Sequence, residues 1–397
     1  MSSRAGIIAL VPESWDAPPR TARHHLLEKL ATHLPVVWVD PARLWREYLP
    51  RPGKPHKLPA PLPCPNRLSV LRASLFAPKV YSPPWLSRAF DRHRLSQARR
   101  MLTRQGVDRV VLYLWRPEFA SALPLVAHDL SCYHIDDEYS FSPEDKGLDQ
   151  AEAALIRRVD QVFIHSHALM EKKGSLNPNT LLAPNGVDYE AFAAPRREPA
   201  DLAPIPHPRV GYVGVIKRHL DLDLMLQVVV RQPEFSFVFV GPVLSIGDQR
   251  GALDALMQRP NCHFVGAKRS EDLPGYMQHL DVGLLCYRVD GYTRYIYPLK
   301  LHEYLASGLP VVGSPIPALS AFKDIILSAD SVDAWSASIA AAAATSRRDA
   351  AQVARRRAAA RAHDWEGLVS NIAATIEARL AAKPAADPRT GALASTG

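Results

Sequence analysis

The stretch YPLKLHEYLASGLPVVGSP, residues 297–315, is typical of a short helix followed by a buried strand. Pro298 suits the first turn of a helix, Gly308 suits a C-terminal cap, and Pro310 prevents the helix from continuing. Lys300 and Glu303 are three residues apart, so both side chains fall on one face near the start of this helix. A helix that only filled space would not need this pair there.

The start of this helix favours an anion. Its free backbone N–H groups and the positive end of its dipole suit a diphosphate, and Lys300 adds a full positive charge. A carboxylate beside a phosphate is unfavourable unless it accepts hydrogen bonds, and a ribose diol supplies two donors for Glu303. The pair therefore predicts a site for a nucleoside diphosphate. The alternative is an exposed Lys–Glu surface pair, worth roughly 0.2–0.5 kcal/mol.

Apolar, β-branched runs alternate with helical patterns along the chain, as expected for parallel sheets covered on both faces. The expected strands lie at 6–11, 35–41, 109–115, 130–136 and 161–166, and then at 209–216, 235–242, 262–267, 281–287 and 310–315. A proline- and charge-rich stretch near 190–208 is typical of a linker. We expect two tandem Rossmann-like, doubly wound α/β domains, 1–195 and 206–380. Helices are expected over 340–362 and 364–382, and a disordered tail over 383–397.

Bulk properties agree with two ordinary domains. The 397 residues are 47% hydrophobic, and the net charge of +8 suits acidic partners. The four cysteines match no zinc spacing, which favours reduced thiols in a reducing compartment. The apolar run at 7–11 is too short for a signal peptide, and no run approaches the roughly 20 residues of a membrane-spanning helix. We expect a cytoplasmic protein without a nucleic-acid-binding motif.

The segment YPLKLHEYLASGLPVV resembles the nucleotide-sugar signature of glycosyltransferases with the GT-B fold, a group that includes bacterial polysaccharide and teichuronic-acid-type enzymes. Other segments follow in the order of that group. They are LLAPNGVDYEAF, RVGYVGVIKRHLDLDLM, FSFVFVGP and NCHFVGAKRSEDLPGYMQHLDVGLLCY. The resemblance spans roughly residues 130–370 and implies a C-terminal donor domain and an N-terminal acceptor domain that face a cleft.

The resemblance also implies roles for donor-site residues. Glu303 would bind the ribose, Lys300 would bind the diphosphate, and Leu301, between them, is a further candidate donor ligand. Gly214 would let the backbone approach phosphate, with Lys217 or Arg218 adding charge or serving only as surface charge. The sequence departs from retaining members of the group at Tyr295, where many carry a first glutamate, so retention is not implied. Arg294, Tyr292 and Asp290 occupy that loop as candidate sugar contacts or as residues that shape it.

Acceptor-side candidates follow strands of the first domain. An inverting transfer needs a general base, and Asp137 is the first choice, followed by Asp136 and His134, with turn or helix-cap roles as the alternative. Adjacent residues on an extended chain face opposite ways, so we expect at most one of the two aspartates to act. In the loop after the first strand, Trp15 is a candidate sugar-stacking or packing residue, and Arg20 or Arg23 a candidate phosphate ligand.

These features predict a hexosyltransferase-type enzyme that moves a sugar from a UDP- or GDP-sugar to a lipid-linked, polysaccharide or small-molecule acceptor. No metal or other cofactor is expected, because Lys300 and the helix N-terminus stabilise the leaving diphosphate. The alternatives are an epimerase or hydrolase of the same fold and a non-catalytic nucleotide-sugar-binding partner protein. Donor turnover without acceptor would favour the former, and binding without turnover the latter.

The stretch 83–106 is basic and amphipathic, with an apolar set that includes Trp85 and Phe90. The cationic residues are Arg88, Arg92, Arg94, Arg99, Arg100 and Arg104. Such a helix is typical of a membrane-surface element, and the alternative is the exposed face of an ordinary helix. It predicts peripheral contact with the inner face of a membrane.

Overall fold

The computed structural model describes residues 4–17, 19–48, 64–65, 67–139, 148–345 and 349–383. The chain forms two compact units, one comprising 1–183 and 368–397 and the other 184–367. Apart from Lys383, the expected tail 383–397 lies outside the described residues. Within the described ranges, no helix combines the length and the apolar character that crossing a bilayer requires.

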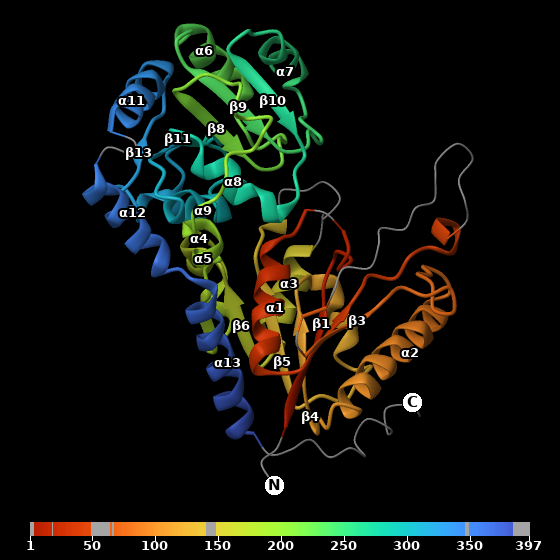
Figure 1. The fold of residues 1–397 in the computed structure, drawn as a ribbon. Helices are drawn as coiled ribbons and strands as arrows, with labels where there is room; N and C mark the ends of the chain where they lie inside the picture. Colours follow the sequence, from red (N-terminus) through yellow and green to blue (C-terminus); the bar gives the residue numbers. More distant parts are fainter. Residues whose placement is uncertain are drawn as a thin grey trace. The chain divides into compact units, whose positions relative to one another are not determined.

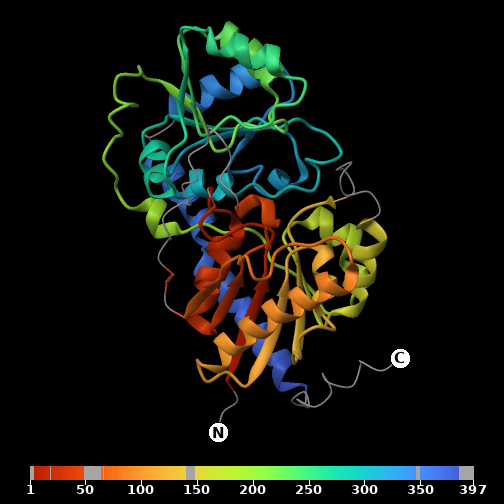
Figure 2. The same cartoon turned by 90° about the vertical axis from the view of Figure 1, so that its right-hand side faces the viewer.

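The first unit is built on a parallel sheet of seven strands in the order β3-β2-β1-β4-β5-β6-β7. Its strands are β1 (Ala5–Leu10), β2 (Val36–Val39), β3 (Leu68–Leu71), β4 (Arg109–Leu114), β5 (Leu130–Ile135), β6 (Gln161–Ile164) and β7 (Thr180–Leu182). Its helices are α1 (Ala22–His33), α2 (Pro84–Thr103), α3 (Leu148–Arg158) and α4 (His167–Lys173), with 3₁₀ turns η1 (Trp45–Tyr48), η2 (Pro117–Ala122) and η5 (Gly174–Leu176). Figure 2 shows α2 lying across the face of this sheet.

The second unit repeats the plan with six strands in the order β10-β9-β8-β11-β12-β13, again parallel. Its strands are β8 (Arg209–Val213), β9 (Ser236–Val240), β10 (Cys262–Gly266), β11 (Val282–Leu285), β12 (Val311–Gly313) and β13 (Leu327–Ser328). Its helices are α5 (Tyr189–Ala193), α6 (Leu222–Arg231), α7 (Arg250–Met257), α8 (Leu273–Gln278), α9 (Leu299–Ala306), α10 (Pro317–Ser320), α11 (Val332–Thr345) and α12 (Ala350–Arg361), with the 3₁₀ turn η6 (Ser270–Asp272). Figure 1 shows these strands and helices labelled.

The expected fold class is confirmed, and each expected strand is present. The sequence did not predict β3, β7 and β13, which are edge strands of two to four residues. Because an edge strand is covered on fewer sides, it has no need of the continuous apolar run that marks a central parallel strand. The helix expected over 340–362 is instead two helices, α11 and α12, and Asp349 caps the second by accepting the Gln352 N–H at 3.1 Å.

The expected linker near 190–208 is a packed part of the second unit. Gln278 donates to the carbonyls of Phe192 and Ala194, both at 2.7 Å. The buried guanidinium of Arg209 donates to the carbonyl of Ile205 at 2.7 Å. These side chains satisfy backbone groups of an irregular segment, and Leu202 and Ile205 within it are buried, although much of the segment is exposed. The structure accordingly divides the chain near 183/184 and not within 195–206.

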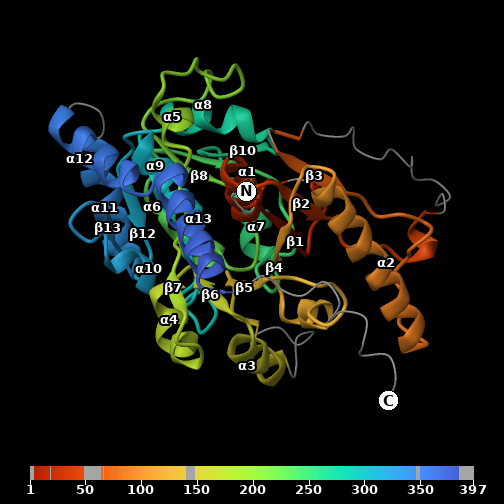
Figure 3. The same ribbon diagram turned by 90° about the horizontal axis from the view of Figure 1, so that it is seen from below.

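The C-terminal helix α13 (Trp365–Ala381) returns to the first unit, although the sequence assigned it to the range 206–380. Arg109 of β4 donates to the carbonyls of Leu380 at 2.7 Å and Lys383 at 3.1 Å. Arg379 donates to the carbonyl of Asp160 at 3.0 Å. Figures 1 and 3 show α13 beside β6. The helix is therefore a structural element of the first unit.

We predict that Ile376→Ala, which truncates a fully buried side chain of α13, lowers the free energy of unfolding by about 2–5 kcal/mol because it leaves a cavity. Urea unfolding followed by circular dichroism measures the change. Glu377→Ala alters the exposed neighbour on the same helix and is the control, expected within about 0.5 kcal/mol of wild type. Equal stability of the two variants would contradict the assignment of α13 to this core.

Candidate functional site

The second unit has its candidate site where the strand order reverses. β8 pairs with β9 on one side and β11 on the other, so the connections leaving β8 and β11 depart in opposite directions. Ligands of doubly wound sheets bind beyond the carboxyl ends of the strands at such a point. The turn after β8 carries Gly214, and the loop after β11 leads into α9.

The helix α9 is held against β8 by Tyr304. The Val213 N–H donates to the Tyr304 hydroxyl at 2.8 Å, and Tyr304 is fully buried. At the other end of α9, Gly308 adopts φ +75° and the Leu309 N–H donates to the Tyr304 carbonyl at 3.0 Å. This is the glycine C-cap expected from the sequence. The first turn of α9 is thus fixed beside the turn after β8.

Gly214 makes room for Lys300. Its φ is +151°, and a Cβ placed on it would stand 1.8 Å from the Lys300 Cε and 2.6 Å from Nζ. The Lys300 ammonium lies 6.0 Å from the centroid of the Tyr212 ring. Gly241, at φ +144°, approaches the same turn so closely that a Cβ on it would stand 2.1 Å from the Gly214 carbonyl oxygen. The sequence analysis did not single out Gly241, although it ends the strand-like run FSFVFVGP.

The charges of Lys300 and Glu303 are left available. Within the described part of the chain, no hydrogen bond or ion pair engages the Lys300 ammonium or the Glu303 carboxylate. Burial lowers the pKa of Lys300 and raises the pKa of Glu303, and in each case the other member of the pair partly offsets the shift. An anion beside Lys300 and hydrogen-bond donors beside Glu303 would relieve this desolvation. This is the arrangement that the spacing of the two residues predicted.

Other predicted donor residues divide into two groups. Leu301 is fully buried in the hydrophobic core, so its assignment as a ligand is wrong: the helix turns that side chain away from Lys300. Lys217 and Arg218 are exposed and follow the glycine turn after β8. They stay candidate phosphate ligands.

The loop after β11 is shaped from within. The Asp290 carboxylate accepts the Thr293 N–H at 2.8 Å, and Thr293 donates its hydroxyl to the Arg288 carbonyl at 2.6 Å, so Asp290 shapes the loop. Tyr292 stacks on His219 with ring centroids 4.2 Å apart, and Arg294 is exposed. Burial, followed by Lys217 and Arg218, lowers the pKa of His219 to about 4. His219 is a neutral aromatic partner that the sequence analysis missed.

In the first unit, a charged network follows the corresponding strands. Arg23 of α1 contacts Asp136, beyond β5, through Nε at 2.8 Å and Nη2 at 2.9 Å. Its Nη1 contacts Glu13, beyond β1, at 2.8 Å. Burial favours the neutral form of Asp136, but the Arg23 guanidinium outweighs it and lowers the pKa of that carboxyl. Asp136 is thus paired and weakly basic, and Arg23 serves this ion pair.

Two other acceptor-side candidates lie in the core of the first unit. His134 is buried within β5, where it stacks on Trp115 with centroids 4.2 Å apart and its Nδ1 lies 2.8 Å from the Tyr113 hydroxyl. Trp15 is fully buried against Trp38, so it packs in the core and offers no face to a sugar.

Arg20 pairs with Glu28 and lies over the Trp15 ring. Asp137 is half-buried and accepts the Glu138 N–H at 2.8 Å, and it stays the candidate base.

Neither group of clustered acids resembles an open cation site. Glu138 and Glu152, which lie near Asp149, both contact the Lys173 ammonium, at 3.2 and 2.7 Å. The Asp221 and Asp223 side chains serve different partners. Asp221 caps α6 by accepting the Leu224 N–H at 3.0 Å, whereas Asp223 lies 3.5 Å from Arg288.

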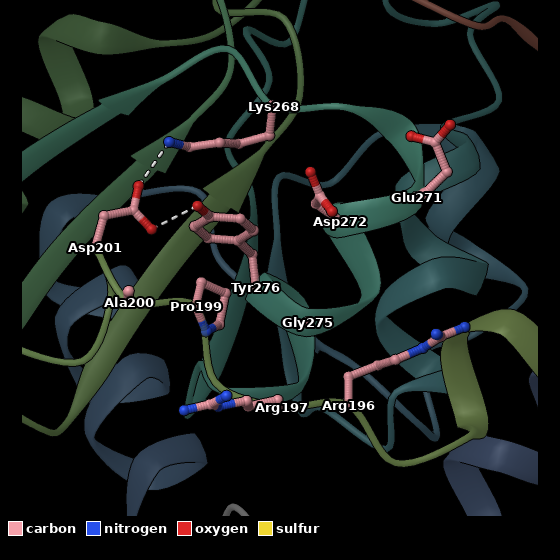
Figure 4. A pocket seen from close by; sticks show the side chains of 10 residues that line it. All are labelled: Arg196, Arg197, Pro199, Ala200, Asp201, Lys268, Glu271, Asp272, Gly275 and Tyr276. Carbon is pink, nitrogen blue, oxygen red and sulfur yellow. Dashed lines mark hydrogen bonds and ion pairs between the residues drawn. The ribbon is translucent and has the colours of Figure 1, made fainter.

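A hollow of about 520 Å³ lies elsewhere in the second unit, beside η6 and α8 (Figure 4). Asp201 joins its walls by contacting Lys268 at 2.6 Å and the Tyr276 hydroxyl at 2.5 Å. The lining includes none of the predicted donor residues. The central Asp201 of this hollow is paired, whereas no hydrogen bond or ion pair engages the Lys300 ammonium or the Glu303 carboxylate among the described residues.

Residues 207–345 match the family described as glycosyl transferases group 1. TuaH of Bacillus subtilis (strain 168), which is assigned as a glycosyltransferase of teichuronic acid biosynthesis, is 28% identical over 249 residues. That match covers 58% of this chain and 62% of TuaH, so the chain spans about six tenths of the length of this relative.

Solved structures share the whole fold at low identity. Sucrose-phosphate synthase from Thermosynechococcus elongatus has a TM-score of 0.69 and 17% identity, over 96% of this chain and 100% of its own. Anabaena HepE, in complex with UDP and glucose, has a TM-score of 0.67 and 13% identity, over 94% and 99%. The Escherichia coli trehalose-6-phosphate enzyme bound with UDP-2-fluoro glucose has a TM-score of 0.65 and 11% identity, over 94% and 98%. These likenesses confirm the GT-B fold.

We predict that Gly214→Ala weakens UDP binding roughly tenfold or more, because the added Cβ displaces Lys300 from the turn and strains the backbone. Isothermal titration calorimetry measures the affinity. Gly251→Ala is the matched control, since a Cβ there meets nothing within 4 Å. Unchanged affinity in Gly214→Ala would contradict the placement of the ligand against this turn.

We predict that acid destabilises the first unit through His134, whose pKa burial lowers to about 3. Between pH 6.5 and about 3, His134 binds a proton in the unfolded chain and not in the folded one. The free energy of unfolding therefore decreases by about 1.4 kcal/mol for each unit by which the pH is lowered. His134→Gln should reduce the slope of unfolding free energy between pH 7 and 5, measured by urea titration. His93→Gln, on the exposed face of α2, should leave the slope unchanged.

Proposed function

We propose that this chain, which belongs with the group 1 glycosyltransferases of GT-B fold, transfers a hexosyl group from a nucleoside-diphosphate sugar to an acceptor hydroxyl. The observation that carries the proposal is the placement of Lys300 across Gly214 with Glu303 on the same helix face, both charges unpaired within the described residues. A diphosphate would accept from Lys300 and from the N–H groups of α9. A ribose diol would donate to Glu303.

UDP-sugars are the first choice of donor. HepE was solved with UDP and glucose, and the E. coli trehalose-6-phosphate enzyme with UDP-2-fluoro glucose. The relative TuaH is assigned to teichuronic acid biosynthesis, which supports a glycan or lipid-linked acceptor. GDP-sugars stay the second choice, because the candidate donor residues would contact the ribose and the diphosphate and would not distinguish one base from another.

The chemistry follows from charge placement. As the bond between the anomeric carbon and the diphosphate breaks, negative charge grows on the leaving oxygen. Lys300 and the start of α9 stabilise that charge without a metal ion. Asp137 is the proposed base that takes the acceptor proton in an inverting transfer, since the ion pair with Arg23 lowers the pKa of Asp136 and makes that carboxylate a weaker base. We also propose that the protein works in the cytoplasm, at the inner face of a membrane when the acceptor is lipid-linked.

We predict that UDP binds the wild-type protein and that Glu303→Ala weakens it roughly 10- to 100-fold, because a carboxylate with two hydrogen bonds to the ribose is lost. Calorimetric titration with UDP and with GDP measures both. Glu271→Ala removes an exposed acid that lines the separate hollow and should bind as wild type does. A folded wild-type protein that binds neither nucleotide would overturn the donor site.

The same preparation separates the alternatives. UDP-sugar consumed only when an acceptor is supplied supports the transferase. Consumption without acceptor would instead indicate an epimerase or hydrolase, and tight binding with no turnover on any acceptor a non-catalytic partner. The fold and the match to group 1 enzymes favour neither alternative.

A further inference from the structure

Five large apolar side chains of the first unit are strongly exposed near the edge strand β3. Scattered exposed apolar residues are ordinary, but a gathering of them marks an interaction surface. They are Trp45, Leu75, Phe76, Tyr81 and Trp85, with exposed fractions of 63, 59, 89, 71 and 68%. We call this set the aromatic edge. The remaining tryptophans are almost fully buried, namely Trp15, Trp38, Trp115, Trp335 and Trp365.

Backbone contacts bring the three segments of the aromatic edge together. Leu44, beside Trp45, forms a parallel bridge with Lys79, whose N–H donates to the Arg43 carbonyl at 2.7 Å. The Lys79 ammonium lies 5.1 Å from the centroid of the Tyr81 ring. Trp85 follows four residues later, in the first turn of α2. Figure 1 shows η1, the 72–83 segment and α2 on the same side of the unit.

Cations surround the aromatic edge. The exposed ones in these segments are Arg46, Lys79, Arg88 and Arg92, together with Arg72, which pairs with Asp16. Two acids lie in the same segments and are outnumbered by the cations: Glu47 is exposed, with its carboxylate accepting the Leu44 N–H at 2.8 Å, and Asp91 is half-buried. The aromatic edge therefore presents apolar rings within a net positive surface.

The C-terminal half of α2 does not share this character. Leu95, Ala98 and Leu102 are buried, Arg94 donates to the Asp40 carbonyl, and Arg99 donates to the Ala127 carbonyl at 3.0 Å. Arg100 and Arg104 are exposed, but the apolar side chains of Ala98 and Leu102 beside them are buried. The apolar groups that a bilayer could meet are therefore confined to the N-terminal half of 83–106, where Trp85 is exposed.

We propose that the aromatic edge docks the first unit on an anionic lipid bilayer. Tryptophan and tyrosine rings suit the headgroup level, where their apolar bodies enter the acyl boundary and their polar atoms stay hydrated. Each arginine or lysine near the surface adds attraction to anionic headgroups. A second copy is a poorer occupant, because a twofold contact would set these cations against one another. This inference names the surface for the membrane location proposed above, and it rests on the proposed function, in which the acceptor is lipid-linked.

The test is co-sedimentation of the full chain with vesicles of phosphatidylglycerol and phosphatidylcholine, against vesicles of phosphatidylcholine alone. We expect the wild type to pellet with the anionic vesicles only. The variant Trp45→Ser/Phe76→Ser/Trp85→Ser should partition roughly tenfold less, and Arg88→Glu/Arg92→Glu should lose a similar factor. Brominated lipid should quench wild-type fluorescence, because Trp45 and Trp85 are the exposed tryptophans.

Val230→Ser/Met257→Ser removes exposed apolar side chains from α6 and α7 and is the matched control, expected to pellet as wild type does. UDP affinity measured on every variant separates loss of membrane binding from failure of the donor site. Wild-type protein left in the supernatant with anionic vesicles overturns the proposal. Full pelleting of the aromatic variant overturns it too. So does light scattering that finds the wild type as a dimer and the aromatic variant as a monomer.

Discussion

The absence of a side chain at Gly214 is the constraint on which the candidate site depends. Lys300 occupies the space that a Cβ would take, and Gly241 supports the same turn from the next strand. Tyr304 then fixes α9 by bonding to the backbone of β8. Two glycines and one tyrosine thereby determine where the ammonium of Lys300 stands. Substitution of Gly214, Gly241 or Tyr304 would displace the Lys300 ammonium even though Lys300 itself is unchanged.

An unpaired charge that is partly shielded from water costs stability, and Lys300 and Glu303 are two such half-buried groups. Burial disfavours the charged forms of Lys300 and Glu303, and the two offset each other only partly. A protein under selection for stability alone would pair them tightly or replace them with apolar groups. Keeping both apart and available is expected where a ligand with an anion and adjacent hydrogen-bond donors completes the set.

The sequence predicted the local geometry of α9 better than the surroundings of the acceptor-side candidates, for a physical reason. Pro298, Gly308 and the Lys300–Glu303 spacing are local signals, and local geometry suffices to place them on one helix face. The directions of His134, Trp15 and Leu301 depend on packing between distant segments, and all three are buried. The partner of Asp136 is Arg23, more than a hundred residues away in sequence, and no spacing rule connects the two.

Six strands of each unit follow the same order, and the first unit adds β7 at one edge, so topology alone does not assign their roles. Both reverse direction beside their central strand, β1 or β8, and both carry charged groups there. In the first unit, Arg23 is matched by Asp136 and Glu13. In the second, Lys300 and Glu303 have no such partners among the described residues. Where charges already neutralise one another, a bound diphosphate adds little favourable electrostatic energy. An uncompensated ammonium beside a helix N-terminus gives a bound diphosphate the larger electrostatic stabilisation. Charge compensation, and not fold, is therefore the reason for which we propose the donor site in the second unit.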